Sequence, residues 1–143
     1  MIKNLFITMM ILNSLNAEFI NNGSTVIDNS TNLQWQDDDI GFKKTWKQAI
    51  DLCEDKSLDS FDDWRLPNIN ELRSIVNRNL KNLKIFQSFK NTEYNIYWTS
   101  TTKAITQQDW AIGVDFNSGR VSTYKKEDAY RETEHYVRCV RSK

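Results

Sequence analysis

Two cysteines have the most distinctive chemistry in this sequence. Cys53 and Cys139 are the only cysteines among the 143 residues, and they do not form a CxxC pair. A thiolate can act as a nucleophile or a redox group, whereas two thiols in an oxidising compartment are usually joined in a disulfide. The single histidine, His135, has no evident Asp or Asn arrangement that would make a catalytic triad. We therefore favour a disulfide over a reactive thiol, and we expect His135 to be an ordinary surface side chain.

The first 17 residues favour an oxidising compartment. Lys3, an apolar stretch from Leu5 to Leu12 and the small residue Ala17 follow the order of a secretory signal peptide. The apolar stretch is too short to span a bilayer. With cleavage after Ala17, we expect a single domain of 143 − 17 = 126 residues over 18–143. It would lie in the periplasm, at the cell surface or outside the cell, without a membrane span.

The charge of the chain is balanced in total but segregated along the sequence. The 19 Lys and Arg residues equal the 19 Asp and Glu residues, which argues against a dedicated nucleic-acid binder. Residues 28–63 contain ten acids and four lysines, whereas residues 72–92 contain five bases and no acid. These five bases, which alternate with apolar residues, are Arg73, Arg78, Lys81, Lys84 and Lys90. They are candidate ligands for an anionic polymer such as a sulfated glycan or lipopolysaccharide. The alternative is a helix end and loop whose lysines are merely solvated.

Two acidic stretches could present carboxylates to a cation. Asp37, Asp38 and Asp39 lack the alternate-residue spacing and central glycine of an EF-hand loop, so we expect a solvated acidic turn. In the stretch from Asp62 to Pro67, we expect Trp64 and Leu66 to pack inward and Asp63 and Arg65 to pair or bond loop backbone. No metal or other cofactor is predicted.

Two stretches of the second half have loop composition, residues 101–109 and 125–135. Loops on a rigid scaffold commonly bind ligands, so four side chains of the second stretch join the candidate site: Lys125, Lys126, Tyr130 and Arg131. Its acids leave it with a net charge of −1, which weighs against a heparin-type site confined to this stretch.

The elements that must position these groups are strands, two helices and then more strands. Thr45 and Gln48 fit a capping box, and Cys53 lies on the apolar face of the helix that follows. Asn68 and Glu71 indicate a second helix start after Pro67. Strands are predicted at 19–20, 26–28, 33–36, 97–100, 110–116, 120–124 and 136–141, with Trp110, Ile112, Val114 and Phe116 on one buried face. The predicted fold class is α+β.

Several motifs occur in an order that resembles a known family. The motifs are DWRLP at 63–67, YWTST at 97–101 and VRCVR at 137–141, together with residues 33–36, 46–53 and 110–119. The chain resembles the Lcl C-terminal domain family, which takes its name from a collagen-like adhesin, over about residues 26–141. The resemblance implies a C-type-lectin-like fold, with two helices and an antiparallel sheet closed by a disulfide from Cys53 to Cys139.

The family resemblance also suggests function classes. Some members are surface adhesin modules that bind sulfated polysaccharides, which implies a non-enzymatic module whose partner is a cell-surface glycan or an envelope protein. The alternatives are a purely structural envelope subunit and a relative of the formylglycine-generating enzymes. Those enzymes use additional reactive cysteines in the C-terminal half, where this chain has only Cys139. Neither the ligand nor the oligomeric state follows from the sequence.

Overall fold

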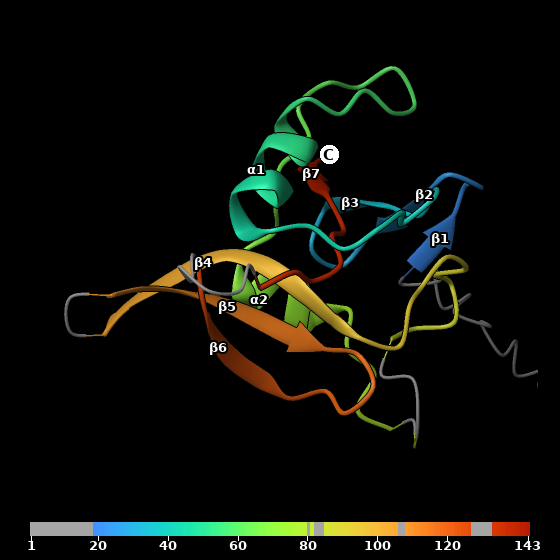
Figure 1. Ribbon diagram of the computed structural model, residues 1–143. Helices are drawn as coiled ribbons and strands as arrows, with labels where there is room; N and C mark the ends of the chain where they lie inside the picture. The colour runs from blue at the N-terminus through green and yellow to red at the C-terminus, as the bar shows by residue number, and fades with distance from the viewer. Residues whose placement is uncertain (1–18, 80, 82–84, 106–107, 127–132) are drawn as a thin grey trace, which may run out of the picture.

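The computed structural model describes residues 19–79, 81, 85–105, 108–126 and 133–143 (Figure 1). The predicted signal peptide at 1–17 lies outside the described residues. The described chain contains two helices, two all-antiparallel sheets and a disulfide, so the α+β prediction is confirmed. No helix in this part of the chain is long and apolar enough to cross a membrane.

The first sheet joins the beginning of the described chain to its end. It has the order β1-β2-β3-β7, formed by Phe19–Asn21, Thr25–Asp28, Leu33–Gln36 and Val140–Ser142. The predicted strand at 136–141 is only partly correct. Tyr136 makes an isolated bridge to Tyr97 in the second sheet, and the chain then crosses to the first sheet before regular pairing begins at Val140.

The second sheet is a meander of β4 (Ile96–Ile105), β5 (Gln108–Asp115) and β6 (Val121–Lys125). The prediction of a loop over 101–109 is wrong, because Thr102 to Ile105 pair with Gln108 to Ala111. This part of the hairpin extends away from the helices in Figure 1. Residues 102–104 are all exposed. The stretch therefore shows no alternation of apolar and polar residues, which is the pattern by which a half-buried strand is recognised in a sequence.

Both helices begin where the sequence predicts. Helix α1 (Trp46–Glu54) has a complete capping box between Thr45 and Gln48, and α2 (Ile69–Ser74) has one between Asn68 and Glu71. These boxes satisfy amide groups that a helix start leaves without partners. Helix α1 packs against β4, and α2 packs against β4 and β5.

The second sheet lies between two cores. Neighbouring residues Tyr97 and Trp98 of β4 are both fully buried, Tyr97 in the core beside the first sheet and Trp98 in the core beneath α1. The single buried face predicted for β5 is therefore incomplete. Val114 and Phe116 are fully buried, but Ala111 is equally buried in the other core, while Trp110 and Ile112 are half-buried.

A buried ion pair connects four parts of the fold. Asp37 and Arg138 are both fully buried, with Oδ1 and Nη1 separated by 3.1 Å. Arg138 also donates to the carbonyl oxygens of Gln36 and Asn91, and Asp37 accepts from the Lys90 amide. The prediction of a solvated acidic turn is thus wrong for Asp37, because a distant arginine supplies the charge that makes its burial tolerable.

Replacing this arginine should strongly destabilise the protein. Arg138→Met leaves the Asp37 carboxylate buried without its counter-charge, which costs about 3–5 kcal/mol. Urea unfolding of wild type, Arg138→Met and the matched exposed control Arg120→Met measures the effect. The control should change the free energy of unfolding by less than about 0.5 kcal/mol. Equal losses in the two variants would contradict the role assigned to the pair.

Candidate functional site

The predicted basic residues, from Arg73 in the last turn of α2 to Lys90, belong to a segment that the core holds at two places. Val76 and Ile85 form an antiparallel bridge, and the Phe86 amide donates to the Ile75 carbonyl oxygen over 3.3 Å. Ile75 and Ile85 are 0% and 1% exposed, and both belong to the core beside the first sheet. Residues 75–76 and 85–86 are therefore held together by backbone contacts in the core, and we call residues 73–90 the basic segment.

The cations of the basic segment face solvent. Arg73, Arg78, Lys81 and Lys90 are exposed, and none of them is within ion-pair distance of a carboxylate in the described part of the chain. Lys90 is held at the backbone by Asp37, and its Nζ donates to the Gln87 carbonyl oxygen over 3.0 Å. The predicted ligand Lys84 lies outside the described residues.

The other predicted cations lie at a different place. Lys125 ends β6, on the side of the second sheet where α1 begins, whereas residues 86–90 run beside β1 (Figure 1). Lys126 is already occupied: its Nζ lies 3.6 Å from Asp109 and 4.4 Å from the centre of the Trp46 ring. Tyr130 and Arg131 lie outside the described residues. Arg73, Arg78, Lys81 and Lys90 are thus exposed on the basic segment, which lies apart from the end of β6 that carries Lys125.

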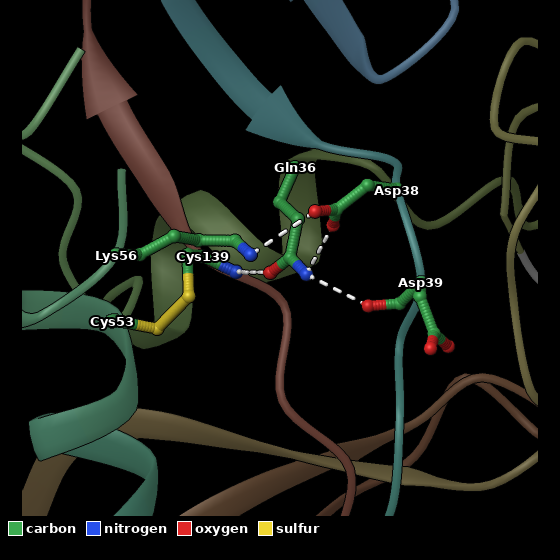
Figure 2. Close-up of a disulfide and its surroundings, with 6 residues drawn as sticks. All are labelled: Gln36, Asp38, Asp39, Cys53, Lys56 and Cys139. Atoms are coloured by element: carbon green, nitrogen blue, oxygen red, sulfur yellow. Dashed lines mark hydrogen bonds and ion pairs between the residues drawn. A yellow bond between two sulfur atoms is a disulfide. The ribbon is translucent and has the colours of Figure 1, made fainter. Parts of the chain in front are cut away.

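The cysteines are bonded to each other, as predicted. Cys53 of α1 and Cys139 before β7 form a disulfide with a Cα–Cα distance of 5.5 Å (Figure 2). Bridging residues 86 apart in sequence restricts the unfolded chain, which on the chain-entropy model contributes about 4–5 kcal/mol to stability. Neither thiol is free for nucleophilic or redox chemistry while the bond is intact.

The polar groups beside the disulfide hold the acidic turn. The Gln36 side chain accepts from the Cys139 amide over 3.0 Å and donates to Asp38 Oδ1 over 2.6 Å (Figure 2). Lys56 pairs with the other oxygen of Asp38 at 3.1 Å. Both oxygens of the Asp38 carboxylate therefore have protein partners. In the described residues no group of three His, Cys, Asp or Glu side chains is placed to hold a metal ion.

Asp63 and Arg65 of the DWRLP motif each form an ion pair with a residue outside the motif. Trp64 and Leu66 are buried, as predicted. Asp63 pairs with Arg141 of β7, and this pairing lowers the pKa of its carboxyl group. Arg65 pairs with Glu71 in α2 at 2.7 Å, which raises the pKa of the guanidinium. The motif therefore holds the second helix and the last strand together, and it presents no carboxylate cluster to a cation.

His135 is buried, contrary to the surface position expected from the sequence. It is 8% exposed, its ring lies 4.5 Å from that of Trp98 and 4.3 Å from that of Tyr124, and its Nε2 has no hydrogen-bond partner. Burial, aided by the charge of Lys43, lowers its pKa from 6.5 to about 4. Paired backbone bonds with Lys44 fix the residue there, a contact between distant segments that local pattern does not reveal.

With this geometry established, comparison with known proteins identifies the family. The model of the Lcl C-terminal domain matches residues 24–141, so the chain belongs to the Lcl C-terminal domain family. No curated protein and no solved structure gave a significant match. The relationship to the C-type-lectin-like fold therefore stays a prediction.

The buried histidine should make stability depend on pH. Because its pKa is lower folded than unfolded, protonation favours the unfolded chain, so the His135 contribution is complete above about pH 6.5 and declines as the pH falls toward 4. Between pH 7 and pH 5, wild type should lose on the order of 1 kcal/mol more stability than His135→Gln, which cannot take up this proton. Urea unfolding of both proteins measures the difference. Parallel pH profiles would show that His135 titrates normally in the folded protein.

Proposed function

We propose that the protein is an exported, non-enzymatic binding module that takes an anionic glycan on the basic segment. One observation carries the proposal: in the described part of the chain, no carboxylate lies within ion-pair distance of the exposed cations Arg73, Arg78, Lys81 and Lys90, and their segment is anchored in the core at Ile75 and Ile85. No acidic residue occurs between Leu72 and Thr92 to reduce their field. Such a local field attracts polyanions although the chain as a whole is neutral.

The mode of attachment favours a rigid presentation of these charges. Ile75, Ile85 and Phe89 are buried, and the Lys90 amide donates to the Asp37 carboxylate. A ligand then meets a segment whose ends are already ordered, so less conformational freedom is lost on binding. Family membership gives further support, since the resemblance implied adhesin modules for sulfated polysaccharides.

A formylglycine-generating-type activity is the less favoured alternative. It would require reactive cysteines, and the two thiols of this chain are joined to each other. A role with an envelope protein as partner, or as a structural subunit of an envelope assembly, would depend on a surface that binds protein. The exposed cations of the basic segment favour a polyanion instead.

Heparin affinity chromatography tests the glycan proposal directly. The wild-type protein should be retained and should elute in a salt gradient, because the attraction is between charges that salt screens. The triple variant Arg73→Glu, Arg78→Glu, Lys81→Glu should elute at much lower salt or pass through unretained.

A matched triple variant separates a local site from total charge. Lys103, Arg120 and Lys143 are exposed cations outside the basic segment, and changing all three to Glu alters the formal charge by the same amount. This variant should elute close to wild type. Equal shifts in the two variants, or no retention of wild type, would overturn the proposal.

A further inference from the structure

The outer edge of β6 carries backbone groups without partners. The Asp115 amide donates to the Arg120 carbonyl oxygen, and the Lys126 amide donates to the Asp109 carbonyl oxygen. The register between β5 and β6 places Ser122 and Tyr124 at the hydrogen-bonded positions between these two pairs. Hydrogen-bonded positions alternate along an antiparallel strand. The N–H and C=O groups of Val121, Thr123 and Lys125 consequently point away from β5, and the described residues supply no partner for them.

The opposite edge of the same sheet is covered between Trp98 and Ser100. The amide of Trp98 in β4 donates to the Tyr136 carbonyl oxygen over 3.0 Å, and the amide of Ser100 donates to that of Pro67 over 2.8 Å. Among the described residues, the edge of β6 thus differs from this part of the edge of β4 in having no backbone partner. Val121, Ser122 and Thr123 are also exposed, so a new strand could approach without displacing any of the described residues.

The charge at this edge selects among possible occupants. Arg120 is exposed at one end of β6 and Lys125 closes the other, with uncharged residues between them. A second copy paired antiparallel about Thr123 would place Arg120 opposite Lys126 and add like charges across the strands. A segment with acidic residues at its two ends would instead meet opposite charges.

We propose that the outer edge of β6 is a docking site for an extended, acid-flanked peptide segment of a partner protein, which adds as a fourth strand to the second sheet. Backbone bonds to Val121, Thr123 and Lys125 hold the peptide, and Arg120 and Lys125 select carboxylates at its ends. The site is separate from the basic segment, so the glycan proposal and this one succeed or fail independently.

Nuclear magnetic resonance with a defined peptide tests the proposal. The probe is the capped peptide Glu-Thr-Val-Thr-Val-Glu, and the control has Lys in place of both Glu residues. In the free protein the amides of Val121, Thr123 and Lys125 should exchange rapidly with solvent. The acidic peptide should shift their signals and slow their exchange, and the control peptide should bind at least about tenfold more weakly.

Three protein variants separate edge pairing from other modes of binding. Thr123→Pro removes an outward N–H without removing a bond to β5, and it should weaken peptide binding about tenfold or more, whereas Thr123→Val should not. The double variant Arg120→Glu, Lys125→Glu should reverse the preference between the two peptides, which keeps the test valid if the proline variant does not fold. Equal binding of both peptides by wild type, absence of binding, or protection of the three amides before peptide is added would overturn the proposal.

Discussion

The ion pair between Asp37 and Arg138 is the interaction on which the rest of the structure depends. Charged side chains that are fully buried must be paired and hydrogen-bonded, and this pair draws partners from β1, β3, the segment before β4 and the chain before β7. The guanidinium also lies 4.9 Å from the ring centre of Phe89 and 5.8 Å from that of Tyr97. Because these segments are far apart in sequence, the pair can be satisfied only when the chain has its complete topology.

The same fold positions two surfaces of different kinds. The Lys90 amide bonded to Asp37 fixes one end of the basic segment, and the bridge between Val76 and Ile85 holds two further points of it together. At the other side of the second sheet, Tyr136 bonds the edge of β4 at Trp98, whereas the outer edge of β6 has no backbone partner among the described residues. One surface thus offers side-chain cations to a polyanion, and the other offers backbone groups to a strand. The disulfide links α1 to the chain segment that contains Arg138.

The sequence predicts those parts of the fold that depend on residues close together in the chain. Capping boxes at Thr45 and Asn68, and the strand at 33–36, depend on residues within a few positions, and all were confirmed. The extension of β4 to Ile105 depends on a partner across a hairpin, and the burial of Asp37 and His135 depends on partners far away in the sequence. For the candidate site, local charge identified the basic segment, but only the three-dimensional fold separates it from Lys125 and Lys126. The open edge of β6 has no sequence signal beyond its flanking cations.

The central claim is that an anionic glycan binds the basic segment and no other part of the molecule. A nuclear magnetic resonance titration with a heparin oligosaccharide tests it most directly, because the change in chemical shift of each backbone amide reports on its own residue. The account predicts that the shifts concentrate on Arg73, Arg78, Lys81 and Lys90 and their neighbours, and that they disappear at high salt. Shifts concentrated at the end of β6, around Lys125 and Lys126, would contradict it.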